Sequence, residues 1–147
     1  MDLDTLLNKN QKEAATYLDS HLRIIAGAGS GKTRVVTYRI AHLIQDVGID
    51  PRSILAITFT NKAANEMKER VNEVVGIHGS GTLICTIHSL CVRFLRQHIN
   101  VLNYPSNFTI MDEEDQKALI KKLYTQLEID AKVISIKSMI NTISSYK

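Results

Sequence analysis

The stretch from Leu22 to Thr33, LRIIAGAGSGKT, decides the fold that this sequence predicts. Its apolar start, with Leu22, Ile24 and Ile25, predicts a short buried strand, and residues 34–45 carry apolar side chains at helical spacing. A glycine-rich turn between a strand and a helix is the context of a phosphate-binding P-loop. The alternative is a flexible Gly/Ser connection between the same two elements. The intact GSGKT favours the P-loop.

The P-loop pattern assigns a chemical role to each part of this turn. The turn contains three glycines, Gly27, Gly29 and Gly31. They let the backbone turn tightly, so that several N–H groups can converge on phosphate oxygens near the start of the next helix. Lys32 would reach the β and γ phosphates, and the Thr33 hydroxyl would bind Mg²⁺. Ala26 stands where the pattern usually has glycine, and it is tolerable if its φ stays negative.

Composition excludes several classes of protein. Hydrophobic residues make up 44% and charged residues 22% of the 147 residues, as in a soluble globular domain. No apolar run approaches about 18 residues, so a membrane span is not expected, and the polar N-terminus is unlike a signal peptide. The net charge of +3 permits nucleic-acid binding without arguing for it. Cys85 and Cys91 have no second Cys/His pair at metal spacing, which favours reduced thiols and a cytoplasmic setting.

The remaining sequence predicts strands that alternate with helices. Further strands are expected at 54–59, 83–86 and 108–111. Helices are expected within 8–20, from 34 to about 47, at 62–75 and 88–100, from 113 to about 128, and from 136 onward. The strand at 54–59 is almost wholly apolar, which predicts helices over both of its faces. The expected inward side chains of the helix at 88–100 are Leu90, Cys91, Phe94, Leu95 and Ile99. This alternation predicts a parallel α/β sheet, whose ligands lie beyond the carboxyl ends of its strands.

Gln11 has two possible roles. It lies three residues after Asn8, the spacing of a capping box at a helix start. Its amide also offers one donor and one acceptor, which match the N6/N7 edge of adenine. The local sequence favours the cap and leaves both roles open.

Five collinear blocks resemble the N-terminus of a superfamily 1 DNA helicase of the UvrD/Rep/PcrA type. They are LNKNQKEA at 7–14, AGAGSGKT at 26–33, AITFTNKAANEMKERV at 56–71, TIHS at 86–89 and IMDEEDQ at 110–116. The resemblance implies a P-loop NTPase with a RecA-like parallel sheet flanked by helices, here incomplete. Residues 1–111 would be part of the first ATP-binding domain, and residues 112–147 would begin an inserted helical subdomain.

The resemblance also implies site residues. ATP would be bound by Gln11, Ala26, Gly27, Ala28, Gly29, Ser30, Gly31, Lys32, Thr33 and Arg34. Lys32 and Thr33 would serve catalysis, and Thr33 would hold Mg²⁺. Single-stranded DNA would be contacted by Thr58, Phe59, Thr60, Asn61, Thr86, His88 and Ser89. An aromatic face can stack on any base and hydroxyl groups can bond phosphate, which suits binding without sequence preference. Ile87 replaces the usual Phe of its block, so base stacking is not expected there.

The sequence lacks part of the machinery that such a helicase needs. No apolar strand ends in Asp-Glu, the pair that would hold Mg²⁺ and activate water, and Asp112 to Asp115 reads as a helix start. We therefore expect an N-terminal fragment that is inactive alone, whose parent is an ATP-dependent helicase acting on single strands and duplex junctions in DNA repair or replication. Its partners would be DNA and the rest of the parent chain. The unpaired edges and an uncovered apolar face of its incomplete sheet could cause self-association. The alternatives are a helicase-nuclease subunit, a non-catalytic nucleotide- or DNA-binding module, and a small-molecule P-loop kinase.

Overall fold

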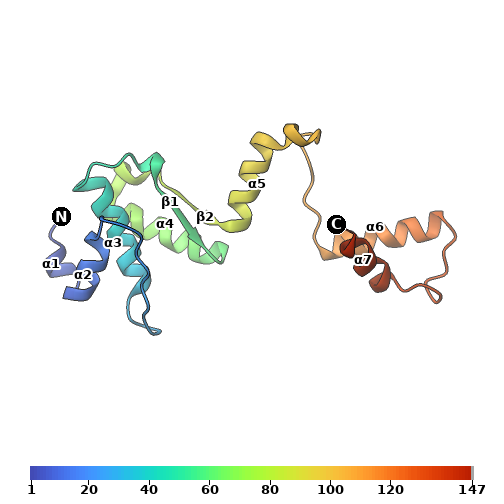
Figure 1. Cartoon of the computed structure of the whole chain (residues 1–147), viewed down its shortest axis with the longest axis horizontal. Coiled ribbons are helices and arrows are strands. Elements are labelled where there is room, and N and C mark those ends of the chain that lie inside the picture. Colours follow the sequence, from blue (N-terminus) through green and yellow to red (C-terminus); the bar gives the residue numbers. More distant parts are fainter. Residues whose placement is uncertain (147) are drawn as a thin grey trace. The chain divides into compact units, whose positions relative to one another are not determined.

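The computed structural model describes residues 1–146, which form two compact units, Met1–Gln97 and the segment from His98 onward. The first unit contains α1 (Leu3–Leu6), α2 (Lys9–Thr16), α3 (Lys32–Gln45), β1 (Leu55–Thr58), α4 (Asn61–Val75), β2 (Leu83–Thr86) and α5 (Ile87–His98), which ends at the boundary (Figure 1). The second unit contains α6 (Glu113–Gln126) and α7 (Ile136–Ser145). Short 3-10 turns occupy Pro51–Ser53, Gly76–Gly79 and Ile99–Leu102.

Polar caps start the helices where the sequence predicts them. The Thr60 hydroxyl accepts the N–H of Ala63 at 3.1 Å at the start of α4. Asp112 begins α6 with a capping box, and Ser135 accepts the N–H of Ser138 at the start of α7. Such caps satisfy N–H groups that have no partner inside the helix, and each contributes about 1 kcal/mol.

The sheet of the first unit consists of two parallel strands. β1 and β2 pair in register from Leu55 opposite Leu83 to Thr58 opposite Thr86. α4 connects them, as expected for two parallel strands joined by a helical crossover. This confirms an α/β architecture with parallel pairing.

The core lies between this sheet and the helices α3 and α4. Its buried members are Ile40, Ala41, Ile54, Met67, Val71, Val75 and Ile84. Val71 is 1% and Ile84 2% exposed, so the α4 stripe packs directly against the sheet. A second cluster joins the N-terminal helices to α3 through Leu3, Leu7, Ala15 and Val35. The second cluster places the start of α3 next to α2.

Arg39 ties α2 to α3 at the other end. Its Nη1 donates to the carbonyl oxygens of Tyr17 at 2.6 Å and Ala14 at 3.2 Å, where α2 ends. A cation at the C-terminus of a helix meets the negative end of its dipole.

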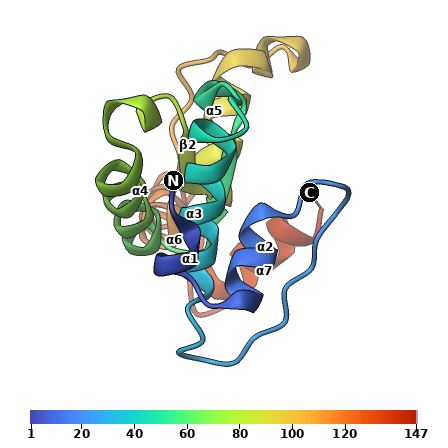
Figure 2. The same ribbon diagram turned by 90° about the vertical axis from the view of Figure 1, so that its left-hand side faces the viewer.

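Two predicted strands are wrong. Residues 22–25 and 108–111 have no strand conformation, and Ile25 is 84% exposed. Figure 2 shows the long connection that leaves α2 and returns to α3. A strand needs a neighbour for its backbone N–H and C=O groups. Within residues 1–146 the two strands pair only with each other, so neither segment has a partner.

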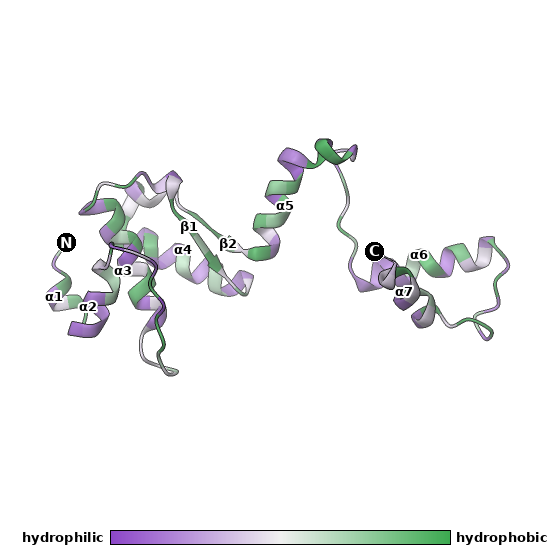
Figure 3. Ribbon diagram, viewed as in Figure 1, coloured by the Kyte–Doolittle hydropathy of each residue, from purple (hydrophilic) through white to green (hydrophobic). Residues whose placement is uncertain are grey.

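One face of the strand at 54–59 is uncovered, which corrects the expectation of two covered faces and agrees with the expectation that an incomplete sheet leaves an apolar face uncovered. Leu55 and Ile57 are each 48% exposed, on the face of β1 opposite the core. Figure 3 shows the hydrophobic colour of β1. The expected apolar stripe of α5 is not buried either, because Phe94 is 61% and Leu95 37% exposed. Among the described residues, helices pack on one face of the sheet only. Within residues 1–146 no helix is long and apolar enough to span a membrane.

Candidate functional site

The glycine-rich loop adopts a tight turn stabilised by Ser30. The Ser30 hydroxyl donates to the carbonyl oxygen of Gly27 at 2.8 Å. Gly29 and Gly31 have φ angles of +75° and +82°, a region that side chains disfavour. Ala26 is not among the residues with positive φ, so alanine is compatible with the turn at that position, as expected.

Lys32 folds back across this loop. Its Nζ donates to the carbonyl oxygens of Gly27 at 2.6 Å and Ala26 at 3.0 Å. Lys32 is also the first residue of α3, with Gly31 as its N-cap and no side chain capping the helix. An ammonium group therefore lies beside free N–H groups at a helix N-terminus. This combination attracts an anion.

Gln11 joins the first helices to the glycine-rich loop. Its Oε1 accepts the backbone N–H of Asn8 at 3.1 Å, and its own N–H donates to Asn8 Oδ1 at 3.0 Å. The predicted capping box is thus confirmed. Its Nε2 also donates to the Ser30 carbonyl oxygen at 3.0 Å, a contact that the sequence did not predict. Two sequence blocks 19 residues apart are therefore linked by a direct hydrogen bond.

A cavity of about 260 Å³ lies between these two blocks. Its lining includes Asn8, Gln11, Ala26, Ser30 and Lys32. The side-chain amide, the ammonium and the loop backbone therefore face one hollow. The exposed Thr33 lies on the first turn of α3 next to Lys32.

Arg34, the last predicted nucleotide contact, does not line this cavity. Its Nη2 donates to the carbonyl oxygen of Leu6 at 2.9 Å, and its guanidinium lies 5.5 Å from the centre of the Tyr38 ring. It lines a separate hollow of about 250 Å³ with Tyr38 and Arg70. The position of the Arg34 side chain in this structure is explained by its hydrogen bond to the Leu6 carbonyl and its cation–π contact with Tyr38.

The predicted DNA-contact residues fall into two groups at the carboxyl ends of β1 and β2. Thr58 and Thr86 are direct partners in the parallel pairing, so the groups after them lie side by side. Phe59 is 94% exposed, and His88 and Ser89 are exposed on the first turn of α5. The structure therefore brings these two blocks together, as predicted from the edge rule for parallel sheets.

The hydroxyl groups at this edge already have protein partners. Thr86 is 5% exposed, and its Oγ1 accepts the Ser89 N–H at 3.2 Å and lies 2.9 Å from Ser89 Oγ. Thr60 caps α4, while Thr58 Oγ1 donates to the Thr60 carbonyl oxygen at 3.1 Å. The exposed groups without a capping role here are Phe59, Asn61 and His88.

The glycine-rich loop is not attached to this sheet edge by strand pairing. The strand predicted at 22–25 would have carried the loop there, but it does not form. The loop is held instead by Gln11 and by the helices α2 and α3. Within residues 1–146 no group of three or more His, Cys, Asp or Glu side chains could hold a metal ion.

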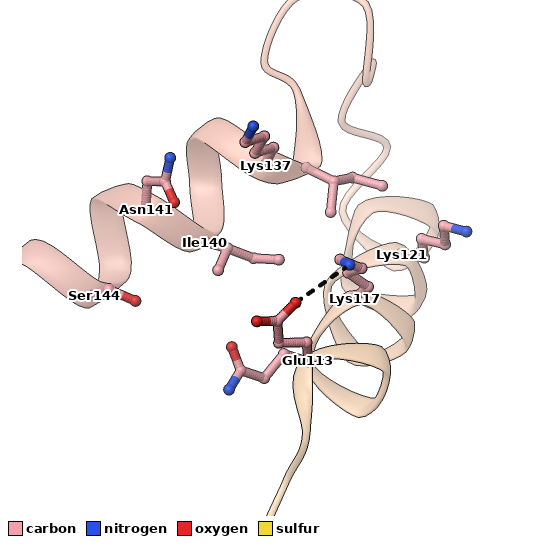
Figure 4. Close-up of a pocket in the computed structure, with 9 residues that line it drawn as sticks. Glu113, Lys117, Lys121, Lys137, Ile140, Asn141 and Ser144 are labelled. Carbon is pink, nitrogen blue, oxygen red and sulfur yellow. Dashed lines mark ion pairs between the residues drawn. The ribbon is translucent and has the colours of Figure 1, made fainter. Parts of the chain in front are cut away.

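A further hollow lies within the second unit, and no predicted site residue lines it. It measures about 820 Å³ between α6 and α7. Lys117 and Glu113 form an ion pair of 3.8 Å on α6, which Figure 4 shows facing Ile140 of α7. Lys121 and Lys137 also line this hollow. Of the five helicase-like blocks, only the one at 110–116 contributes to it, through Glu113 and Gln116.

Comparison with known proteins identifies similar sequences. Residues 7–147 match the family model described as UvrD/REP helicase N-terminal domain. The chain is 48% identical over 141 residues to the ATP-dependent DNA helicase PcrA of Bacillus subtilis (strain 168), covering 96% of this chain and 19% of that protein. It is 46% identical over 141 residues to the proteins of the same name from Staphylococcus aureus (strain Mu50) and Staphylococcus epidermidis, with the same coverage. The chain thus spans 19% of the length of these relatives.

Proposed function

Since this chain belongs to the UvrD/REP helicase N-terminal domain family, we propose that it is the ATP-binding part of an ATP-dependent DNA helicase. The parent protein would couple ATP hydrolysis to movement along single-stranded DNA and to duplex unwinding. The relatives are named ATP-dependent DNA helicases, and the matched sequence includes all five blocks. These names support a helicase and not a nuclease subunit or a small-molecule kinase.

One observation carries the proposal. The Gln11 amide and the GSGKT loop, predicted separately as adenine and phosphate contacts, share a cavity and are linked through Ser30 at 3.0 Å. A nucleotide needs these two contacts close together because its base and its phosphates belong to one small molecule. A flexible Gly/Ser connection without function would not require a link to the helix start at Asn8.

The residues present fit a nucleoside triphosphate. A Cβ built on Gly27 or Gly29 meets nothing within 4 Å, so the loop backbone is accessible. Phosphate oxygens would replace the carbonyl groups of Ala26 and Gly27 as partners of the Lys32 ammonium. The backbone of Ala28 to Gly31 and the start of α3 would supply N–H donors, and Arg34 would add charge near the nucleotide.

The Thr33 hydroxyl would be a ligand of Mg²⁺ together with the phosphate oxygens. A bound Mg²⁺ neutralises phosphate charge during phosphoryl transfer. Such a site is completed by an Asp-Glu pair at the end of an apolar strand. This sequence contains no apolar strand that ends in Asp-Glu. We therefore propose that this chain binds nucleotide weakly and does not hydrolyse it at a useful rate by itself.

The edge formed by Thr58 and Thr86 would bind single-stranded DNA. Phe59 offers an exposed ring for stacking, and Asn61, His88 and Ser89 offer polar groups beside it. Thr58, Thr60 and Thr86 would contribute through the loop shapes that their hydrogen bonds fix. If side chains bind the DNA phosphates, the affinity for single strands and for duplex junctions should fall as the salt concentration rises.

The rest of the parent chain would complete a RecA-like P-loop sheet around β1 and β2. The exposed Leu55 and Ile57 are the apolar face that further strands and helices would cover. The same face could cause self-association of this chain by itself. We propose that the inserted helical subdomain begins at residue 112 and that the protein acts in the cytoplasm, in DNA repair or replication.

The direct test is ATP binding by the purified chain, measured by calorimetry with Mg²⁺ present. We expect weak binding in the millimolar to micromolar range that Lys32→Ala abolishes and that Lys122→Ala, an exposed lysine on α6, leaves unchanged. Equal binding by the wild type and Lys32→Ala would contradict the proposed site. Steady-state ATP turnover that Lys32→Ala abolishes would show that the chain is active alone, against our expectation.

A further inference from the structure

Asn8 is outside the nucleotide-binding residues proposed above, yet it holds the one side chain proposed to read the base. Its backbone N–H donates to Gln11 Oε1 at 3.1 Å. A backbone N–H can only donate and the Ser30 carbonyl can only accept. The two partners therefore fix which end of the Gln11 amide is oxygen and which is nitrogen. If the amide were flipped, both hydrogen bonds would be lost.

The amide keeps unused capacity in this orientation. A glutamine oxygen has two lone pairs, and its NH₂ group has two hydrogens. Asn8 uses one lone pair and Ser30 uses one hydrogen. One acceptor site and one donor site remain, and the cavity adjoins Gln11 and Asn8. These are the groups that complement the N6–H₂ donor and N7 acceptor of adenine, whereas guanine presents two acceptors, O6 and N7, at the same edge.

We infer that Asn8 is a positioning residue for base selection. Its backbone N–H holds the Gln11 amide in the one orientation whose remaining donor and acceptor select adenine over guanine. The capping box is thereby part of the base-reading device. The inference rests on the proposed nucleotide site and adds to it the residue that sets the purine preference.

The local backbone allows this N–H to be removed without changing the chain direction. Asn8 has φ −72° and ψ 167°, within the range that proline requires. Leu7 has φ −131° and ψ 147°, the extended conformation favoured before proline. In Asn8→Pro, a ring carbon replaces the amide hydrogen and occupies the space that Gln11 Oε1 needs. In Asn8→Ala the N–H stays, while both variants lose the side chain that caps α2.

Asn8→Pro and Asn8→Ala are therefore a matched pair that differs in the N–H group. We would measure dissociation constants of ATP and GTP for the wild type and both variants by calorimetry. We expect the wild type and Asn8→Ala to prefer ATP, and Asn8→Pro to lose about three- to tenfold of that preference, the effect of one hydrogen bond. Mere destabilisation would weaken ATP and GTP binding alike and leave their ratio unchanged.

Each outcome has a distinct meaning. A wild type that binds neither nucleotide overturns the proposed function. A wild type that binds ATP and GTP equally well overturns base selection by Gln11. An ATP preference that survives in Asn8→Pro overturns the role of Asn8 and leaves the proposed function intact.

A second measurement needs only the wild-type chain. The side-chain NH₂ group of Gln11 gives two proton signals in ¹⁵N-resolved NMR, assigned by their loss in Gln11→Glu. We expect ATP to shift one of them and to leave the proton bonded to Ser30 in place, while GTP shifts neither. Loss of the Ser30-bonded signal on ATP addition would show that the amide swings out of the cap, and would overturn the inference.

Discussion

Thr58 and Thr86 lie opposite each other as the last paired residues of two parallel strands. This pairing places the segment after β1 next to the segment after β2, although α4 separates them in the chain. The two threonines nevertheless differ in burial. Thr86 is 5% exposed and its hydroxyl bonds Ser89, whereas Thr58 is only partly buried.

This difference predicts that the two alanine variants affect different properties, stability for Thr86→Ala and DNA binding for Thr58→Ala. Thr86→Ala removes the acceptor for the Ser89 N–H at the start of α5, so the free energy of unfolding should fall by about 1 kcal/mol. Thr58→Ala should change stability less and weaken single-stranded DNA binding more. Urea unfolding and fluorescence anisotropy with a labelled oligonucleotide measure the two effects. Thr86→Ser keeps the hydroxyl group, so its stability should be close to that of the wild type. If Thr86→Ser is as unstable as Thr86→Ala, the capping role is contradicted.

Arg39→Ala should be among the most destabilising single changes at an unburied position. It removes a charged donor from the carbonyl groups at the end of α2, a contact worth about 1.5–3 kcal/mol. Lys12→Ala is the matched comparison, since it removes only a surface ion pair with Asp4 at 2.7 Å, worth about 0–1 kcal/mol. Thermal unfolding of both variants measures the difference. Equal losses would show that the Arg39 contacts contribute no more than a surface pair.

Gly31→Ala should disturb the loop more than Gly27→Ala. At Gly31 an added Cβ would meet Gln11 Nε2 at 2.8 Å, and the φ of +82° costs about 1–2 kcal/mol for a residue with a side chain. At Gly27 the same atom meets nothing within 4 Å, and φ is not positive. Hydrogen exchange at the Val35 N–H, which bonds the Gly31 carbonyl at 3.0 Å, measures the effect on the first turn of α3. Comparable exchange rates in both variants would contradict this account.

The stability of the first unit should depend on Asp46 in acid. The His42 ring nitrogen at 2.8 Å, followed by the Met1 amino group at 3.0 Å, holds the pKa of the Asp46 carboxyl below its ordinary value of 3.8. Because the folded state favours the charged form, the stabilisation is present above 3.8 and is lost as the pH falls through the lowered pKa.

The test is the difference in melting temperature between the wild type and Asp46→Asn. It should be largest near about pH 6 and shrink as the pH approaches about 2. Asp19→Asn, at an exposed position between α2 and the glycine-rich loop, is the control. A difference that stays constant over this range would exclude the proposed contribution of the Asp46 carboxylate.

Local sequence was sufficient to predict where most helices start. The helix starts at Asn8 and Asp112 followed from short-range hydrogen bonds between a side chain and N–H groups two or three residues later. The parallel pairing of Thr58 with Thr86 followed from the alternation of strands and helices. The link from Gln11 to Ser30 could not be predicted, because a contact over 19 residues depends on how α2 packs against α3.

The sequence by itself determined the glycine-rich loop, its lysine and threonine, and the two polar segments that end the paired strands, because each depends on residue types at fixed short spacing. Only the tertiary structure decided that Leu22 to Ile25 stays without strand pairing, since a strand exists only where another backbone offers complementary groups. It also decided that Leu55, Ile57 and Phe94 remain exposed, because hydrophobic side chains are buried only where a packed neighbour covers them. The loop AGAGSGKT is thus defined by its sequence, and its position is set by Gln11 and by the packing of α2 against α3.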